Sequence, residues 1–238
     1  MAPNPGEFLE HLRQHGYHSR SNKHSNALAE AIVADLVDNC PKIAQRAVAG
    51  ELVYQLNFTL RAGRADWNVD LVFGAPGIGN PEAPEDGRIR RANPAGVQIA
   101  IEIKSVMTEH RKAVKNRKRD LEAHHEHVHN CDASAVAGGV LVVNASPEFQ
   151  SPLRDEKTVH RNVNALVEHC ISELRSVAGR GDRRGYGLDA KAGIVVVMDN
   201  IDFAASRYLD RPPAPVPGDP LHYDSFVRAI CDQYTRRF

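Results

Sequence analysis

The spacing of apolar side chains predicts helices along the chain. Over residues 25–39 they recur at Leu28, Ile32 and Leu36, about one helical turn apart, which is typical of an amphipathic helix. A second segment, 109–129, is strongly charged, and its apolar residues stand seven positions apart, which also favours a helix. The predicted helices cover residues 25–39, 109–129, 156–177 and 222–236.

Alternating or continuous apolar stretches predict strands. Residues 97–106 alternate most clearly between apolar and other side chains, whereas 135–145 is apolar throughout, as in a strand buried on both faces. The predicted strands cover residues 51–60, 67–73, 97–106, 135–145 and 193–198. The order of helix, three strands, helix and strand predicts an α/β fold with a central mixed β-sheet flanked by helices.

Glycine and proline divide the chain without splitting it into separate domains. The stretches 74–96, 179–193 and 211–220 are rich in these residues and are predicted loops or linkers. A length of 238 residues suits one domain with a substantial core. We therefore expect a single domain over 1–238, with a core of about 25–200 and a helical segment of about 221–238 after the Pro-rich linker.

Composition narrows the cellular context. Neither a long apolar run nor a signal-like N-terminus is present, so we expect no membrane partner. The four cysteines are widely scattered and form no paired motif, which indicates reduced thiols and a cytoplasmic protein. Basic and acidic side chains number 30 each, so net charge neither requires nor excludes a nucleic-acid partner.

Three charged residues interrupt otherwise apolar strands. In strand 97–106, Glu102 and Lys104 lie on the face opposite Ile99, Ile101 and Ile103 because side chains alternate. In strand 67–73, Asp70 interrupts an apolar set formed by Val69, Leu71 and Phe73, which are expected to share one face. A buried carboxylate is costly without a partner or a metal. If the strands are neighbours, Asp70 and Glu102 converge on one divalent cation, with Lys104 beside it.

This set of residues resembles the PD-(D/E)XK nuclease superfamily, which includes most type II restriction endonucleases. Asp70 is followed about thirty residues later by Glu102-Ile103-Lys104, and the resemblance covers roughly residues 25–145. It implies a restriction-endonuclease-like core, metal-binding roles for Asp70 and Glu102, and a catalytic role for Lys104. Glu30, on the first predicted helix, is a possible accessory residue. Val69 stands where the family motif has proline.

The resemblance implies a Mg²⁺-dependent endonuclease that hydrolyses DNA phosphodiester bonds, with Mn²⁺ as a substitute metal. Its implied role is that of a sequence-specific type II restriction endonuclease acting on double-stranded DNA as a homodimer. A repair, recombination or mobile-element nuclease of the same fold is the alternative within this class. A non-catalytic nucleic-acid-binding protein is an alternative outside it.

A run of basic side chains follows the Glu102 strand. Between residues 104 and 119 there is a single acidic residue, Glu109. Such a run suits contact with a phosphate backbone, although the solvated face of a helix has the same composition. The candidate DNA-binding residues are Arg111, Lys112, Lys115, Arg117, Lys118 and Arg119.

The same predicted helix also contains a zinc-peptidase-like motif. His125, Glu126 and His129 follow the H-E-x-x-H spacing, which on a helix places two imidazoles one turn apart beside a carboxylate. No histidine follows His129 within twenty residues to supply a third ligand. Histidines near a helix C-terminus also interact favourably with its dipole, so a helix end is the simpler interpretation of this motif.

Overall fold

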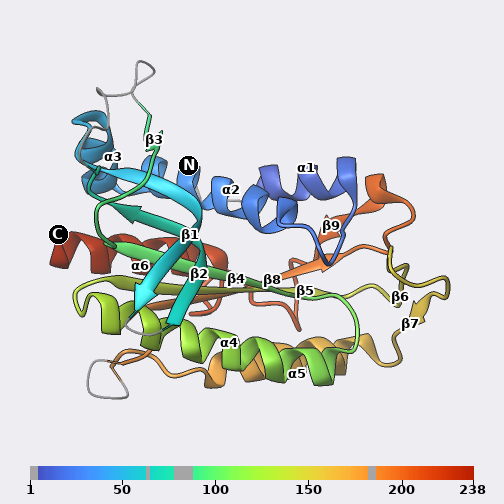
Figure 1. Ribbon diagram of the computed structural model, residues 1–238. Coiled ribbons are helices and arrows are strands. Elements are labelled where there is room, and N and C mark those ends of the chain that lie inside the picture. Colours follow the sequence, from blue (N-terminus) through green and yellow to red (C-terminus); the bar gives the residue numbers. More distant parts are fainter. Residues whose placement is uncertain (1–4, 63–64, 78–87, 182–185) are drawn as a thin grey trace.

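The computed structural model describes residues 5–62, 65–77, 88–181 and 186–238. In the described chain, helices come first, a group of strands follows, and helices and strands are then interspersed up to the last helix (Figure 1). The helices are α1 Gly6–His15, α2 Lys23–Asn39, α3 Pro41–Val48, α4 His110–Cys131, α5 Val163–Ser176 and α6 Tyr223–Arg237, with a short 3-10 helix at Phe203–Ala205. The strands are β1 Val53–Ala62, β2 Ala65–Gly74, β3 Arg90–Arg91, β4 Ile99–Val106, β5 Val136–Asn144, β6 Glu148–Phe149, β7 Thr158–Val159, β8 Ala190–Val197 and β9 Arg207–Tyr208.

Seven of these strands form one mixed sheet in the order β3-β1-β2-β4-β5-β8-β9. The central strands β4, β5 and β8 are parallel, whereas β1 and β2 form an antiparallel hairpin and β2 is antiparallel to β4. β6 and β7 form a separate two-stranded sheet. The predicted α/β fold with a central mixed sheet flanked by helices is therefore confirmed.

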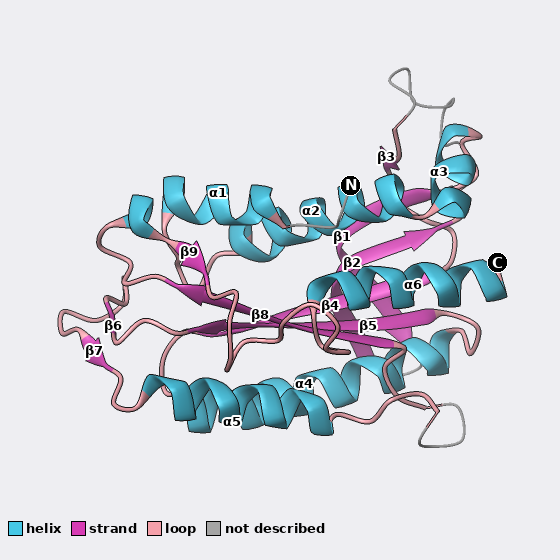
Figure 2. Ribbon diagram, turned by 180° about the vertical axis from the view of Figure 1, so that it is seen from behind, coloured by secondary structure: helices cyan, strands magenta, loops and turns pink. Residues whose placement is uncertain are grey.

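Helices cover both faces of the sheet and bury two apolar clusters (Figure 2). Helices α1, α2 and α6 lie on one side, where Leu28, Ile101 and Phe226 belong to one cluster. Helices α4 and α5 lie on the other side, where Val114 and Leu174 belong to the second. β5 is buried along its whole length because both layers cover it.

The last helix is part of the main core rather than an appendage. α6 contacts β8, β5 and α2, and Phe226, Ile230 and Tyr234 are fully buried. The residue that follows the Pro-rich segment also contacts the sheet, since the Gly193 N–H donates to the Leu221 carbonyl at 3.0 Å. Within the described residues, no helix is long and apolar enough to cross a membrane.

The β1–β2 hairpin changes faces along its length. Leu71 and Phe73 lie in the cluster under α2, whereas Val69 lies in the cluster under α4. The expectation that these three side chains share one face was wrong. Asn57, across the hairpin from Asp70, has a φ of 50°, a left-handed conformation that asparagine tolerates better than most residues. The hairpin bends at this position, and its far end packs on α4.

The interpretation of all four cysteines as reduced thiols was also wrong. Cys40, between α2 and α3, forms a disulfide with Cys231 on α6, and their Cα atoms are 5.4 Å apart. The two residues are 191 positions apart, so only the packing of α6 against α2 brings them together. Cys131 and Cys170 are free.

Candidate functional site

The site lies where β2 and β4 separate. The two strands pair over only three positions, from Phe73↔Ile99 to Leu71↔Ile101, and Asp70 and Glu102 follow directly beyond that pairing. There the Asp70 Oδ2 accepts a hydrogen bond from the Ile103 N–H at 2.7 Å. The Asp70 carboxylate thus accepts the hydrogen bond that a backbone carbonyl of β2 would accept if the two strands stayed paired.

Glu102 and Lys104 point from β4 toward the α4 layer. Glu102 is only 2% exposed, and its Oε1 forms an ion pair with the Lys104 ammonium. Its other oxygen, Oε2, is buried and has no hydrogen-bond partner among the described residues. The structure therefore brings Glu102 and Lys104 together on one face of β4, as alternation predicted, and Asp70 lies beside them where β2 separates from β4.

Burial raises the pKa of both carboxyl groups of the site. Burial, and then the charge of Asp70, raise the pKa of Glu102 to about 7, although Lys104 opposes the shift. Burial also raises the pKa of Asp70, against the opposing effects of the Ile103 N–H, Lys104 and the Ser25 hydroxyl. Burial lowers the pKa of Lys104, but the charge and hydrogen bond of Glu102 outweigh it and leave that pKa raised. Lys104 is therefore a protonated cation at neutral pH.

Several polar residues surround the site, and of these the sequence singled out only Arg117, as a candidate DNA-binding residue. Tyr17, between α1 and α2, interacts with the Ser105 hydroxyl and with Arg117. The Arg117 Nε donates to the Ser105 carbonyl at 3.3 Å, and its guanidinium pairs with Asp120 at 3.1 Å. The charge of Asp120 acts on both Glu102 and Lys104. These groups come from three separate segments, and Tyr17, Ser105 and Asp120 carry no signal in the sequence that would place them at the site.

Glu30, the possible accessory residue, has different partners. It accepts a hydrogen bond from the Tyr54 hydroxyl at 2.8 Å and lies 3.8 Å from the Arg91 guanidinium. Both partners lie at the β1–β3 edge of the sheet. Among the contacts of the described residues, none joins Glu30 to Asp70 or Glu102.

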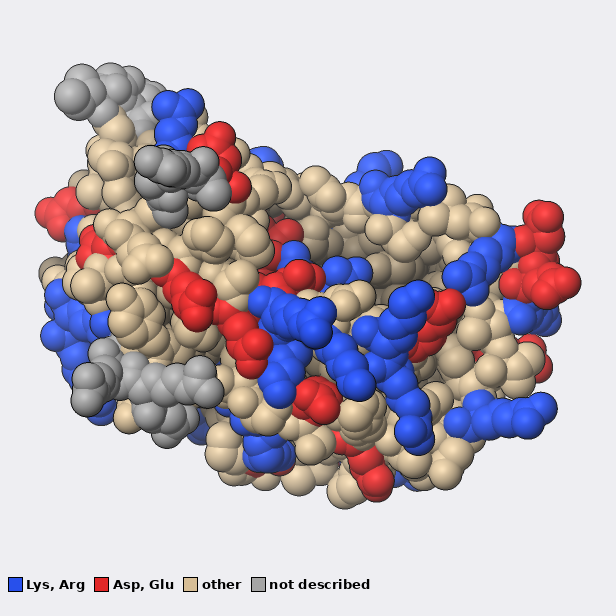
Figure 3. Space-filling view, turned by 60° about the horizontal axis from the view of Figure 1, so that its bottom comes forward, with Lys and Arg blue, Asp and Glu red and all other residues tan. Residues whose placement is uncertain are grey.

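The basic run occupies the N-terminal half of α4, and its members differ in exposure. Lys118 is held by α5, at 3.1 Å from Glu173 and 2.7 Å from the Ser176 hydroxyl, and Arg117 is held by Asp120 and Ser105. The remaining members are exposed: Arg111, Lys112, Lys115 and Arg119. Figure 3 shows lysines and arginines gathered on this side of the molecule, with acidic side chains among them.

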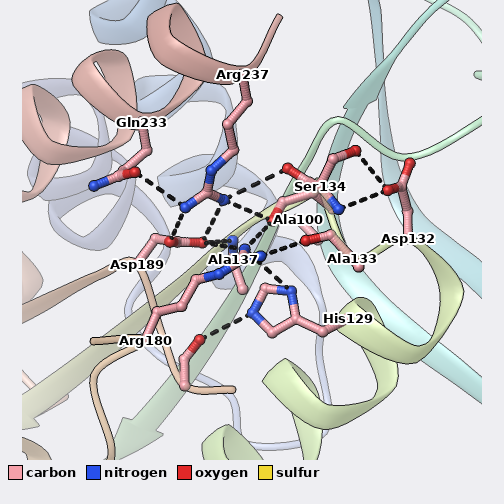
Figure 4. Close-up of polar contacts among 12 residues, drawn as sticks. Ala100, His129, Asp132, Ala133, Ser134, Ala137, Arg180, Asp189, Gln233 and Arg237 are labelled. Carbon is pink, nitrogen blue, oxygen red and sulfur yellow. Dashed lines mark hydrogen bonds and ion pairs between the residues drawn. The ribbon is translucent and has the colours of Figure 1, made fainter. Parts of the chain in front are cut away.

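The zinc-peptidase-like motif lies in a structural contact. His125 and His129 are buried, whereas Glu126 is exposed and lies outside that buried contact. The His129 Nε2 is 3.0 Å from the Gly187 carbonyl, and its Nδ1 is 3.4 Å from Arg180 (Figure 4). Across the ranges that the structure describes, no group of three or more His, Cys, Asp or Glu side chains is arranged to hold a metal ion.

Arg180 belongs to a network that joins the chain end to the sheet (Figure 4). Asp189, whose side chain is 2% exposed, pairs with Arg237 at 2.5 Å and with Arg180 at 3.5 Å. The Ala137 N–H also donates to the Asp189 carboxylate, at 2.8 Å. The buried charge of Asp189 therefore has several partners. These structural contacts account for the burial of His129 and Asp189 without a catalytic role for either residue.

No protein-family model, curated protein or solved structure matches this chain. The geometry of the site therefore carries the functional argument.

Proposed function

We propose that the chain is a metal-dependent endonuclease that hydrolyses DNA phosphodiester bonds at Asp70, Glu102 and Lys104. The observation that carries this proposal is the buried pair of carboxylates, in which Glu102 Oε2 has no hydrogen-bond partner among the described residues. A divalent cation held by Asp70 and Glu102 would offset the burial that raises both pKa values and the charge of Asp70 that raises the pKa of Glu102 further.

The residues present fit Mg²⁺, or Mn²⁺ as a substitute. Magnesium prefers oxygen ligands and is commonly bound by one or two carboxylates, with waters and substrate phosphates completing its shell. Asp70 and Glu102 would hold it. When bound, it supplies Lewis-acid stabilisation of phosphate oxygens and lowers the pKa of a coordinated water. Two protein carboxylates suffice for such a site.

Lys104 supplies a fixed positive charge. Its raised pKa keeps it protonated, which suits it to orient the attacking water and to stabilise the negative charge that builds on the phosphate. It is held beside the reacting position by its ion pair with Glu102. Asp70 is held in turn by the Ile103 N–H, so all three groups depend on β4 for their position.

The surroundings support a nucleic-acid substrate. The exposed basic residues of α4 follow directly from the strand that carries Glu102 and Lys104, and such a surface binds phosphate backbones. We propose double-stranded DNA as substrate and a type II restriction endonuclease as the role. That role implies a homodimer in the cytoplasm, although the Cys40–Cys231 disulfide removes the reduced thiols from which that location was predicted. Repair, recombination or mobile-element cleavage would use the same site.

The test is a cleavage assay on methylated and unmethylated plasmid and phage DNA, with Mg²⁺ or EDTA. Wild type is compared with Asp70→Asn, Glu102→Gln and Lys104→Met. Asp155→Asn and Lys157→Met are matched controls, because Asp155 and Lys157 have the same acid-x-Lys spacing in the sequence and are both exposed. Discrete Mg²⁺-dependent fragments, kept in the controls and lost in the three site variants, are expected. Intact DNA from folded wild type in every condition contradicts the proposal.

A further inference from the structure

Four histidines gather where α1 meets α2, and their imidazoles form the α1–α2 histidine cluster. The two helices contact each other on one side of the sheet, and residues 16–22 connect them (Figure 2). An open cavity of about 440 Å³ lies at this junction. The described residues that line it include no acidic side chain and are His11, His15, His18, Ser21, Lys23 and His24.

The rings of this cluster pack closely. The ring centroid of His11 lies 4.9 Å from that of His15, on the next turn of α1, and 5.3 Å from that of His24 on α2. His24 is only 6% exposed, and the Tyr17 ring stacks on it with a centroid distance of 4.6 Å. Like charges this close repel strongly where water is excluded, so the packing favours neutral rings.

One hydrogen bond of the cluster requires an uncharged His24. The His24 Nε2 accepts from the His18 N–H at 2.7 Å. A backbone N–H only donates, so Nε2 keeps its lone pair and the ring hydrogen is on Nδ1. Protonation places a hydrogen on both ring nitrogens, and this hydrogen bond is then lost. The connection between α1 and α2 is therefore fastened to His24 only while the ring is neutral.

The surroundings of His24 disfavour a positive charge. The residue lies in the first turn of α2, where the helix dipole is unfavourable to a cation. Burial and then the charge of His11 lower the pKa of His24 to about 4, and the backbone contact with His18 does not outweigh them. Burial, followed by the charges of His15 and Lys23, also lowers the pKa of His11. The cluster therefore holds its two inner rings in the neutral form.

Tyr17 connects the cluster to the candidate functional site. Its ring stacks on His24, and its hydroxyl interacts with the Ser105 side chain and with Arg117. Ser105 lies on β4, directly after the site residues of that strand. The position of Tyr17 beside β4 thus depends on the packing of an uncharged His24.

We propose that the α1–α2 histidine cluster is a pH-sensitive latch, which opens when His24 gains a proton and then releases Tyr17 from β4. The sheet and α6 remain folded when the junction opens. The titratable and charged groups that face His24 come from α1, α2 and their connection, and they are His11, His15, Tyr17, His18 and Lys23. Among these described neighbours no carboxylate offsets a charge on His24.

The direction of the response follows from the lowered pKa of His24. The ordinary pKa of 6.5 applies when the junction is open, and a pKa of about 4 applies when it is closed. The contribution of His24 to closure is therefore complete above about pH 6.5 and is lost as the pH falls toward 4. The latch concerns the fold of this junction and does not rest on nuclease activity.

The test is amide hydrogen exchange of the full chain, followed by NMR at pH about 7 and about 5 and corrected for the intrinsic pH dependence of exchange. The His18 amide reports on the bond to His24, and the Tyr17 amide, which donates to the Asn200 side chain at 2.6 Å, reports on Tyr17. At the lower pH the protection of both should fall about tenfold, because the open junction binds a proton more tightly. Amides of α6 should keep their protection. Unchanged protection of either amide, or an equal loss in α6, overturns the proposal.

One substitution isolates the proton on His24. His24→Gln keeps an oxygen that can accept from the His18 N–H but gains no charge, so the protection of both amides should be the same at the two pH values. His169→Gln, at a half-buried histidine of α5, is the matched control and should respond as wild type does. Equal losses in wild type and His24→Gln would assign the response to another group and overturn the proposal. The wild-type comparison depends on neither variant, because α6 of the same molecule is its internal control.

Discussion

The Oε2 atom of Glu102 and the Nδ1 atom of His124 lie 3.9 Å apart inside the protein, and neither has a hydrogen-bond partner among the residues that the structure describes. The His124 Nε2 faces the Ala100 carbonyl at 3.3 Å, and burial lowers the pKa of His124 to about 3, so the ring is neutral. A lone pair therefore faces a carboxylate oxygen in a dry environment. Either a proton on Glu102 or a nearby cation removes the repulsion between the His124 lone pair and the Glu102 carboxylate.

The first prediction concerns pH and stability. The pKa of Glu102 rises from 4.5 to about 7 on folding, so its protonated form stabilises the fold below about pH 4.5, and this contribution is lost as pH rises through 7. Relative to Glu102→Gln, wild type should lose about 3 kcal/mol of unfolding free energy across this window. Urea denaturation of both proteins at several pH values without metal measures the difference. A constant difference would contradict the assigned shift.

The second prediction concerns metal binding. At pH 8, where Glu102 is ionised, Mg²⁺ should raise the Tm of wild type. When the metal is at a hundred times its Kd, the free energy of unfolding should increase by about 2.7 kcal/mol. Asp70→Asn and Glu102→Gln should abolish the rise, whereas Glu30→Gln should keep it because Glu30 pairs with Tyr54 and Arg91. Thermal unfolding with MgCl₂, and with NaCl at equal ionic strength, tests this. An equal response of all four proteins would place the metal elsewhere.

The third prediction separates two neighbouring basic residues of α4. Arg119 is exposed, whereas Lys118 is bound to Glu173 and Ser176 on α5. Arg119→Ala should weaken DNA binding and lower its salt dependence by about one counterion. Lys118→Met should leave that salt slope unchanged and cost at most about 1 kcal/mol of stability. Fluorescence anisotropy with a labelled duplex at several salt concentrations distinguishes them. A salt slope that changes in Lys118→Met but not in Arg119→Ala would contradict the prediction that Arg119, and not Lys118, contacts DNA.

The fourth prediction concerns the disulfide between Cys40 and Cys231. A cross-link that closes a loop of this length stabilises a protein by about 5 kcal/mol in the chain-entropy model. Cys231→Ser, or reduction of wild type, should therefore lower the unfolding free energy by several kcal/mol in that model. Chemical denaturation with and without reductant measures this effect. Cys131→Ser is the control, because Cys131 is free and exposed.

The sequence predicted the central elements because their periodicity is strong. The alternation of 97–106 gave β4 and the orientation of Glu102 and Lys104, and the heptad-like spacing gave α4. Helix α1 was missed because only Phe8 and Leu12 of its ten residues are buried. The predicted helix 156–177 begins only at Val163, since Thr158 and Val159 pair with β6.

The surroundings of the site could not be predicted in the same way. Tyr17 carries no local signal, and His124 shares the apolar face of α4 with Leu121 and Val128, but both reach β4 only because α2 and α4 pack on opposite faces of the sheet. Likewise, the bend at Asn57 moves Val69 to the face under α4, and strict alternation along the strand does not predict this change of face. These features depend on tertiary packing, whereas alternation along a strand reports only on local geometry.

The hydrogen bond from the Ile103 N–H to Asp70 gives that carboxylate a structural task that Lys104 does not share. If the proposed nuclease activity is correct, a descendant of this protein that no longer cleaves DNA would therefore not lose the three residues in random order. Lys104 would be replaced together with Glu102, because removal of the lysine alone leaves the buried Glu102 carboxylate without its ion pair. Asp70 would persist, or drift only to asparagine, which also offers an oxygen to the β4 amide. An aspartate retained beside a missing lysine would be the molecular trace of a lost activity.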